Sequence, residues 1–228
     1  MIGIIFDFNG TLYDDTAKQK MAWERMFEKY RHNEITSDEM AEHVHGRNNR
    51  HTLEYMMDRQ LSNSEVDKYS DEKEALYRLL CKDDELNFHL REGVPEYLDA
   101  LKDAKIPVTI ATASGLDNVK FFFDSFGLSR WFDLSKVVYN DGSIKGKPKP
   151  DIFLKAAENI HVPIQKDIVF EDSGSGFAAA ENAEAGWIVG VETSDNYKTI
   201  RSDKRLATVI SEYTDSNKFL NADFLKVL

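Results

Sequence analysis

The chain has 228 residues, of which 42% are hydrophobic and 30% charged, and this is enough to bury one substantial core and a smaller second one without disulfides. Its formal net charge of −11 argues against nucleic acid or an anionic membrane surface as a partner, because both would be repelled by most of the exterior. A single cysteine cannot form an internal disulfide. The sequence has no apolar run near the roughly 20 residues that cross a bilayer, and its first residues lack the basic leader of a signal peptide. We therefore expect a cytoplasmic protein.

Short apolar runs that end in small or acidic residues predict buried strands. In chain order they lie at residues 2–8, 107–113, 167–171 and 187–191, with a weaker candidate at 136–139. Helical patterns alternate with these runs, for example the apolar spacing between Val119 and Phe126. Alternating strands and helices indicate a parallel sheet with helices on both faces. We therefore predict an α/β fold with a Rossmann-like parallel sheet core.

The segment at 15–88 breaks this alternation, because it shows helical patterns and no convincing strand. The sequences at 36–39 (Thr-Ser-Asp-Glu) and 62–65 (Ser-Asn-Ser-Glu) both fit capping boxes, in which a hydroxyl and a carboxylate satisfy free N–H groups at a helix start. We expect an inserted all-helical cap at 15–88, with the core formed by residues 1–14 and 89–228.

Polar residues at the ends of the predicted strands carry the chemical signal, because open parallel sheets bind ligands beyond the carboxyl ends of their strands. The first run ends in Asp7 and is followed by Asn9, while other runs and loops supply further candidates. These are Thr112 and Ser114 after the second run, Lys147 in a later loop, and Glu171 and Asp172 at the end of the run at 167–171. One such residue alone would be a weak signal, whereas four ordered groups predict one site.

These groups, in this order, resemble the haloacid dehalogenase superfamily, whose hydrolases share an Asp-x-Asp-Gly-Thr opening, a Thr or Ser after a second strand, a Lys and a late acidic pair. The segments at 147–153 and 170–180 resemble the third and fourth motifs of the family over their full length. The resemblance covers the whole chain, and the helical insertion resembles the cap of the phosphoglycolate phosphatase and β-phosphoglucomutase branch. It implies a hydrolase of phosphoric monoesters.

The resemblance assigns Asp7 as the nucleophile, and attack by a carboxylate on phosphorus gives an aspartyl-phosphate that water then hydrolyses. Lys147 would pair with Asp7 and with the transferring phosphoryl group, and Thr112 would donate a hydroxyl hydrogen bond to the same oxygens. Ser114 has two interpretations, as a phosphate ligand or as the cap of the helix that follows it.

The acidic residues are also expected to bind Mg²⁺, which prefers octahedral oxygen ligands and retains several waters. Asp7 and Asp172 would supply carboxylates, and the family pattern implies the main-chain carbonyl of Asn9 as a third ligand. Glu171 belongs to the same predicted metal site, as an acceptor around the ion rather than a direct ligand.

Asn9 departs from the family pattern, which has an Asp at this position that protonates the leaving group and then activates water. An amide can orient a water or the leaving oxygen but cannot shuttle a proton. General acid–base catalysis contributes roughly 10²- to 10⁴-fold, so we expect slow turnover of substrates with poor leaving groups. The chain also has Gln19 where the resembling β-phosphoglucomutase has a cap histidine, which makes mutase activity less favoured.

The preferred hypothesis is a magnesium-dependent phosphatase of a small phosphorylated metabolite, with a cap that closes over the site and offers Arg47 or Arg50 as substrate contacts. Two alternatives stay open. A 2-haloacid dehalogenase would use Asp7 to attack carbon and would need no metal, and a binding protein would have kept the phosphorylated ligand while losing turnover. The substrate, the pathway and the oligomeric state, monomer or dimer, do not follow from the sequence.

Overall fold

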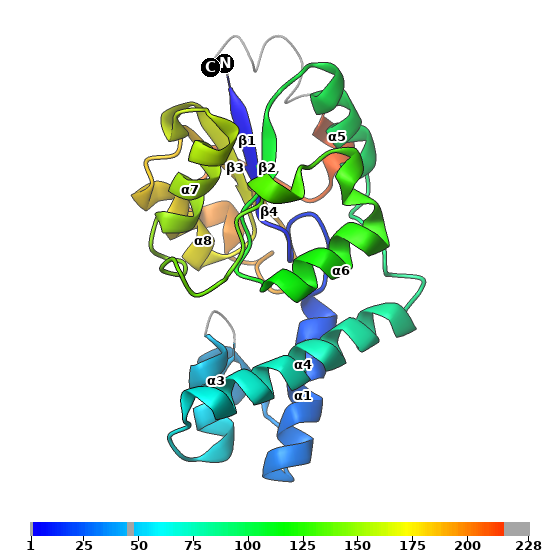
Figure 1. Cartoon of the computed structure of the whole chain (residues 1–228), viewed down its shortest axis with the longest axis vertical. Helices are drawn as coiled ribbons and strands as arrows, with labels where there is room; N and C mark the ends of the chain where they lie inside the picture. Colours follow the sequence, from blue (N-terminus) through cyan, green and yellow to red (C-terminus); the bar gives the residue numbers. More distant parts are fainter. Residues whose placement is uncertain (1, 45–47, 217–228) are drawn as a thin grey trace. The chain divides into compact units, whose positions relative to one another are not determined.

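The computed structural model describes residues 2–44 and 48–216. The chain divides into two compact units, Met1–Asp14 with His89–Leu228, and Asp15–Phe88. Figure 1 shows the helices and strands of both units in the order of the sequence. Within the described ranges, none of the helices is long and apolar enough to span a membrane.

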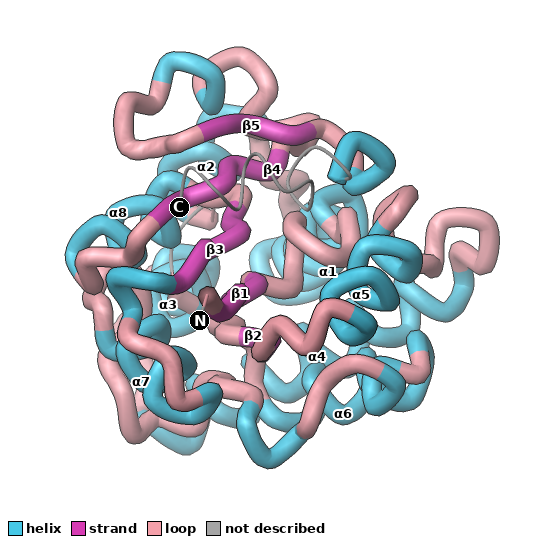
Figure 2. The backbone as a smooth tube through the Cα atoms, turned by 90° about the horizontal axis from the view of Figure 1, so that it is seen from above, coloured by secondary structure: helices cyan, strands magenta, loops and turns pink. Residues whose placement is uncertain are grey.

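A parallel sheet forms the centre of the first unit, here called the core unit. Its strands are β1 (Gly3–Phe6), β2 (Val108–Ile110), β3 (Asp167–Glu171), β4 (Trp187–Val191) and β5 (Thr208–Ile210). Among the described residues the sheet has five strands in the order β2-β1-β3-β4-β5, visible from above in Figure 2. Every neighbouring pair is parallel, so the predicted α/β fold class is confirmed. The strand order changes direction at β1, which is where such sheets bind ligands.

The predicted strands differ from the observed ones at two places. Residues 136–139 do not form a strand, and Val138 makes only an isolated parallel bridge with Ala111. The 3₁₀ turn η2 (Leu134–Lys136) fills the start of that segment. The edge strand β5 was not predicted, because its three residues are too few to show a clear apolar period.

Helices cover both faces of the sheet (Figures 1 and 2). One face carries α5 (Val94–Asp103) and α6 (Leu116–Phe126), and the other carries α7 (Asp151–Ile160) and α8 (Gly174–Asn182). On the second face, Phe153 of α7 and Ala180 of α8 belong to the buried cluster that includes Ile5 and Val169 of the sheet. Short 3₁₀ turns complete the unit, at η1 (Leu128–Arg130), η3 (Ile164–Lys166), η4 (Ile200–Ser202) and η5 (Tyr213–Ser216).

The second unit, here called the helical unit, contains α1 (Thr16–Arg31), α2 (Ser37–His43), α3 (Asn49–Met57) and α4 (Asn63–Asp83). Trp23, Met26, Phe27, Leu53 and Met56 are among the residues of its own hydrophobic core. Both predicted capping boxes are confirmed, at the start of α2 and at the start of α4.

Candidate active site

Three neighbouring strands end at the same edge of the sheet and place the predicted residues beside one another. In the register of the sheet, Phe6 of β1 lies between Ile110 of β2 and Phe170 of β3. The next residue, Asp7, donates its main-chain N–H to the Phe170 carbonyl at 2.9 Å. Because parallel strands share one carboxyl edge, residues from three distant parts of the sequence meet around β1.

Lys147 forms the centre of this cluster. Its Nζ lies 2.7 Å from Asp7 Oδ1 and 2.6 Å from Glu171 Oε2. The three side chains are only 8%, 7% and 1% exposed. Burial alone would lower the pKa of Lys147, but the charges of Asp7 and Glu171 outweigh burial and hold that pKa above its usual range. The lysine is therefore a permanent cation beside the Asp7 carboxylate.

The second oxygen of Glu171 is also occupied. Its Oε1 accepts hydrogen bonds from Ser173, from the main-chain N–H at 3.1 Å and from the hydroxyl at 2.6 Å. The first turn of α8 packs closely against this carboxylate, since a Cβ at Gly176 would lie 1.9 Å from the Glu171 carboxyl carbon. Glu171 is thereby held with one oxygen toward Lys147.

The residues of this cluster fit a divalent cation. Carboxylate oxygens of Asp7, Glu171 and Asp172 lie within 4.8 Å of one another. Gly10 lets the main chain pass close to this group, because it has a φ of +77° and a Cβ there would lie 2.1 Å from Asp172 Oδ2. Ligands that are all oxygen suit a hard ion such as Mg²⁺.

Asn9 lies in a network of hydroxyl groups. Its Oδ1 is 2.8 Å from Ser114 Oγ and 3.4 Å from Thr112 Oγ1, and both hydroxyls donate to it. The expectation that Ser114 caps the following helix is wrong, because the N-cap of α6 is Gly115 and no side chain caps it. The predicted contact of Thr112 with a phosphoryl group would require its hydroxyl to turn away from Asn9.

Asn196, which the sequence analysis missed, ties the ends of β3 and β4 together. Its Nδ2 donates to the main-chain carbonyls of Asp172 at 2.7 Å and Val191 at 2.9 Å. Its Oδ1 accepts the N–H of Thr193 at 2.8 Å. The available signal was its place five residues after a predicted strand. It therefore holds the main chain of one of the three acidic residues in the cluster.

Arg91 is a second missed residue. Its guanidinium donates to the carbonyls of Gly10 at 3.1 Å, Glu192 at 2.6 Å and Ser211 at 3.0 Å. It therefore joins the loops that follow β1, β4 and β5. An arginine in the return segment from a helical insertion has no sequence pattern that would reveal these partners.

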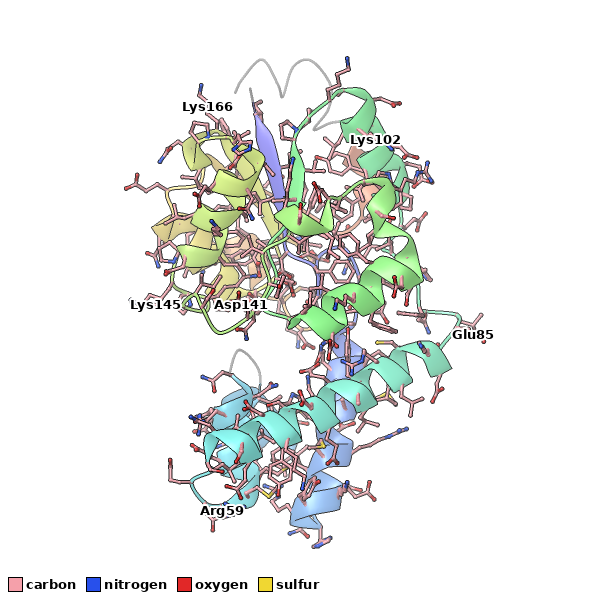
Figure 3. All side chains as sticks on the ribbon, in the orientation of Figure 1. Arg59, Glu85, Lys102, Asp141, Lys145 and Lys166 are labelled. Atoms are coloured by element: carbon pink, nitrogen blue, oxygen red, sulfur yellow. The ribbon has the colours of Figure 1, made fainter. Side chains whose placement is uncertain are left out.

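The structure describes one of the two arginines that the sequence analysis named as substrate contacts. Arg47 falls outside the described residues. Arg50 is described, and its guanidinium donates to Glu54 at 3.2 Å, to the Leu61 carbonyl at 2.9 Å and to Asn63 at 2.6 Å. Lys145, a neighbour of Lys147, is exposed and lies at the outer margin of its loop (Figure 3).

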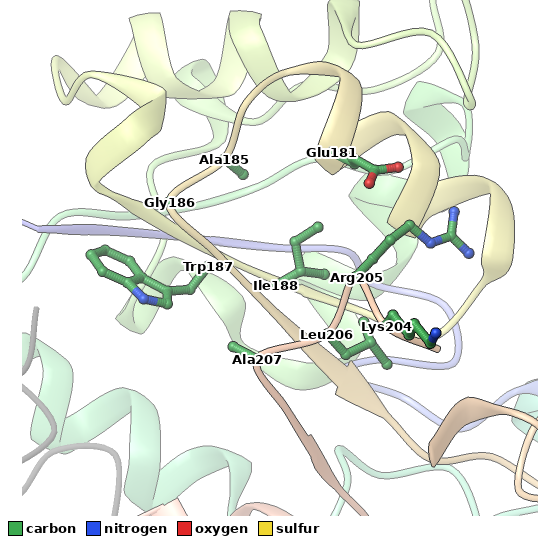
Figure 4. A pocket seen from close by; sticks show the side chains of 9 residues that line it. All are labelled: Glu181, Ala185, Gly186, Trp187, Ile188, Lys204, Arg205, Leu206 and Ala207. Carbon is green, nitrogen blue, oxygen red and sulfur yellow. The ribbon is translucent and has the colours of Figure 1, made fainter. Parts of the chain in front are cut away.

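A cavity of about 340 Å³ lies elsewhere, beside Trp187 at the amino end of β4 (Figure 4). Lys204, Leu206 and Ala207, which precede β5, contribute to its lining. None of the described site residues lines this cavity. It lies at the end of the strands opposite to Asp7, so the acidic cluster and Lys147 define the candidate active site.

Comparisons with known proteins identify the family. Residues 4–189 match the model of the haloacid dehalogenase-like hydrolases. A "Phosphorylated carbohydrates phosphatase" from Thermotoga maritima is 28% identical over 200 residues, which cover 86% of this chain and 88% of the relative. A "Probable pseudouridine-5'-phosphatase" from Drosophila melanogaster is 30% identical over 188 residues, which cover 78% of this chain and 77% of the relative.

A solved structure gives the same answer. The crystal structure of a HAD hydrolase, family IA, variant 3, from Entamoeba histolytica superposes with a TM-score of 0.88 at 35% sequence identity. The superposition covers 94% of this chain and 95% of that protein. The chain belongs to the haloacid dehalogenase-like hydrolase family, as its motifs predicted.

Proposed function

We propose that this member of the haloacid dehalogenase-like hydrolase family is a magnesium-dependent phosphatase that acts on a small phosphorylated metabolite through an aspartyl-phosphate at Asp7. The observation that carries the proposal is the buried contact of Lys147 with Asp7 and Glu171, with Asp172 beside it. This arrangement combines a carboxylate, a fixed cation and a place for a second cation. The two curated relatives described above, both named as phosphatases, support the same reaction.

Asp7 is the nucleophile in this proposal. A carboxylate oxygen attacks phosphorus, the bond to the leaving oxygen breaks, and water later hydrolyses the acyl phosphate and restores the carboxylate. Lys147 neutralises charge on the transferring phosphoryl group, and it is already in place because Glu171 holds it 2.6 Å away. A group fixed before the reaction requires no reorganisation in the transition state.

Asp7 and Asp172 would hold Mg²⁺, with the main-chain carbonyl of Asn9 as the third protein ligand. Such an ion would neutralise negative charge on the phosphoryl group during its transfer to Asp7. Asn196 supports this arrangement through its 2.7 Å hydrogen bond to the Asp172 carbonyl, as residues around metal ligands commonly do.

The test is a screen of phosphorylated metabolites with and without magnesium, in which phosphate release is measured for the wild type and for Asp7→Asn. We expect magnesium-dependent release that is lost on chelation and falls at least about 10³-fold in Asp7→Asn. Circular dichroism should show an unchanged fold, since the substitution is nearly isosteric.

Two results would contradict this function. Release of chloride from 2-haloacids without magnesium would identify a dehalogenase. Tight binding of a phosphorylated metabolite without turnover of any compound in the screen would identify a binding protein.

A further inference from the structure

The guanidinium of Arg91 binds three main-chain carbonyls that lie far apart in the sequence. Its Nη1 donates to the Gly10 carbonyl at 3.1 Å, and its Nη2 donates to the carbonyls of Glu192 at 2.6 Å and Ser211 at 3.0 Å. The side chain is only 11% exposed, and an arginine is not deprotonated in proteins. Arg91 is therefore a largely buried, permanent donor at the point where the loops after β1, β4 and β5 meet.

Arg91 also joins the two segments that connect the core unit with the helical unit. Its main-chain N–H donates to the Leu12 carbonyl at 2.9 Å, and its Nη1 lies 3.3 Å from Asp14 Oδ2. Asp14 is the last residue of the core unit before the helical unit, and the chain returns to the core unit at His89. One residue therefore holds both connecting segments beside the loop that follows Asp7.

The loop that Arg91 holds lies against the acidic cluster. A Cβ at Gly10 would lie 2.1 Å from Asp172 Oδ2, so the main chain passes this carboxylate more closely than a side chain would allow. The neighbouring Thr11 Oγ1 donates to Asp172 Oδ1 at 3.4 Å. A shift of the Gly10 main chain would therefore change the spacing between this loop and the Asp172 carboxylate.

The loop that follows β4 is held in a similar way. Arg91 binds the Glu192 carbonyl, and Asn196, four residues later, donates to the carbonyls of Val191 at 2.9 Å and Asp172 at 2.7 Å. Arg91 thus contacts both of these loops, and each of them also contacts Asp172.

We propose that Arg91 is a positioning residue for phosphoryl transfer, which holds the loop after Asp7 against Asp172 and so fixes the spacing of the acidic cluster. The inference rests on the phosphatase function proposed above and adds a residue to it. Arg91 acts through the main chain and not on the substrate, because both terminal nitrogens of its guanidinium donate to carbonyls of the loops. Residues that orient metal ligands typically contribute roughly 10- to 100-fold to metal affinity or activity.

The shape of the guanidinium gives a conservative variant with a clear meaning. An arginine offers several N–H donors in a rigid, planar fork, whereas the lysine ammonium is a compact charge at the end of a flexible stem. Arg91→Lys therefore keeps the positive charge but cannot bind the carbonyls of Gly10, Glu192 and Ser211 together. A defect in this variant reports on the fork and not on the charge.

Three measurements on Arg91→Lys test the proposal. Hydrogen exchange of the main-chain N–H groups of residues 9–13 should be faster, because their hydrogen bonds lie within the loop that Arg91 holds. Calorimetric titration of the substrate-free protein should give a magnesium dissociation constant roughly 10- to 100-fold higher than that of the wild type. With 4-nitrophenyl phosphate at saturating magnesium, kcat should fall about tenfold and KM should change by less than about twofold. Arg91→Met, which also removes the charge, should show each effect more strongly, and the lysine variant carries the test if the methionine variant does not fold.

Two control variants separate this role from general stability. Leu101→Ala leaves a cavity in the core unit, since Leu101 of α5 is fully buried, and lowers the stability of the fold without a change in these hydrogen bonds. Arg201→Met removes an exposed guanidinium that binds the side chain of Glu192 at 2.8 Å and not a main-chain carbonyl. Both should keep the magnesium affinity and the kcat of the wild type. Wild-type values of both quantities in Arg91→Lys, or an equal loss of magnesium affinity in Leu101→Ala, would overturn the proposal.

Failure of this proposal can be distinguished from failure of the phosphatase function. If the wild type with magnesium releases no phosphate from 4-nitrophenyl phosphate, or if Asp7→Asn releases it equally fast, the function is wrong, while hydrogen exchange and calorimetry still test Arg91. If the wild type requires Asp7 and magnesium but Arg91→Lys keeps the wild-type magnesium affinity and kcat, only the role of Arg91 is wrong. A wild type that binds no magnesium would contradict both.

Discussion

Each of the two units of the chain contains a buried lysine, and the partners of these lysines differ. In the core unit, Lys147 contacts two carboxylates, of which Asp7 is 140 positions away in the sequence. In the helical unit, Lys73 Nζ lies 2.8 Å from the neighbouring Glu74 and 2.8 Å from the amide oxygen of Gln19. The core unit thus places one lysine between two carboxylates, while Lys73 has a single carboxylate partner from its own unit.

The same contrast holds for other polar groups. At the strand ends of the core unit, Asp7, Glu171 and Asp172 bring three carboxylates together around one lysine. In the helical unit, Glu39 accepts from Arg31 at 2.6 Å and from the Tyr55 hydroxyl at 2.6 Å. Arg31 and Tyr55 hold the pKa of Glu39 well below its usual range. Several carboxylates therefore meet at the candidate site, whereas Glu39 of the helical unit is paired with groups that support its own fold.

Among the variants that compare the two units, the largest expected effect is that of Lys147→Met, which removes the cation beside Asp7 and Glu171. Two buried carboxylates would lose the cation that neutralises them, and breaking a buried ion pair destabilises a protein by about 3–5 kcal/mol. We expect kcat to fall by roughly 10²- to 10³-fold. Urea unfolding and phosphate release measure the two effects.

The matched variant is Lys73→Met in the helical unit. It removes the lysine beside a single carboxylate, Glu74, whose side chain is 25% exposed, so we expect a smaller loss of stability and no direct loss of the chemical step. Equal losses of kcat in the two variants would remove the distinction between the two lysines.

Asp172→Asn has the next largest expected effect, on the requirement for magnesium. The amide loses the charge that attracts the ion, and we expect the magnesium concentration for half-maximal activity to rise at least about 10–100-fold. Asn196→Ala should raise it less, because it removes hydrogen bonds to the main chain, including that to the Asp172 carbonyl, and leaves the Asp172 carboxylate in place. Titration of activity with magnesium measures both. A requirement that stays unchanged in Asp172→Asn would place the ion elsewhere.

The strand-end rule explains how much of this site could be predicted from sequence. Asp7 comes directly after β1, and Glu171 is the last residue of β3. The parallel register of these strands brings the two residues together whatever their separation along the chain. The partners of Ser114 and Asn196 could not be predicted, because a hydroxyl or an amide bonds equally well to a helix end, a loop or a side chain. Only the folded structure shows which of these groups lies within hydrogen-bond distance of Ser114 or Asn196.

Prediction of the strands from sequence has the same limit. Two strands of five residues each in the sheet were predicted with their observed bounds, at 167–171 and 187–191. The run at 136–139 has a similar local pattern but forms only a bridge to Ala111. Pairing of a short segment at the margin of a sheet depends on tertiary contacts, which local periodicity does not contain.

A buried carboxyl at the other end of β3 gives a third prediction, on pH dependence. Asp167 is fully buried, and the main-chain N–H of Gly3 offers it at most a weak hydrogen bond that opposes the effect of burial. Burial raises its pKa to about 7 from an ordinary value of 3.8. Because the pKa is higher in the folded state than in the unfolded state, protonation of Asp167 favours the folded state. This contribution to the free energy of unfolding is fully present below the unfolded pKa and is lost as the pH rises through 7.

Between about pH 5 and about pH 8, Asp167 should therefore reduce the free energy of unfolding by about 2–3 kcal/mol. Asp167→Asn cannot ionise and should lack this part of the pH dependence. Comparing urea unfolding of the two proteins at both pH values isolates the effect, since a constant penalty for the amide cancels in the difference. If the free energy of unfolding changed with pH in the same way in both proteins, the pKa of Asp167 would not be raised in the folded state.

Substitution of Arg50 has the smallest expected effect on stability. It tests whether this polar group of the helical unit serves only the structure of that unit. Its guanidinium bonds to Glu54, to the Leu61 carbonyl and to Asn63, which joins α3 to the start of α4. Arg50→Ala should therefore lower the free energy of unfolding by about 1 kcal/mol. We expect KM to change by less than about twofold, because these contacts already use both terminal nitrogens of the guanidinium.

Ser62→Ala is the control for this variant. It removes the hydroxyl that accepts the Glu65 N–H at the start of α4, a loss that is typically worth about 1 kcal/mol, and it carries no charge that a phosphate could use. The two variants should therefore disturb the same region by similar amounts. If KM rises in Arg50→Ala and stays constant in Ser62→Ala, the arginine contributes to substrate binding beyond its structural role. That result would contradict the contrast between the two units, because a polar group of the helical unit would then serve the reaction as well as its own fold.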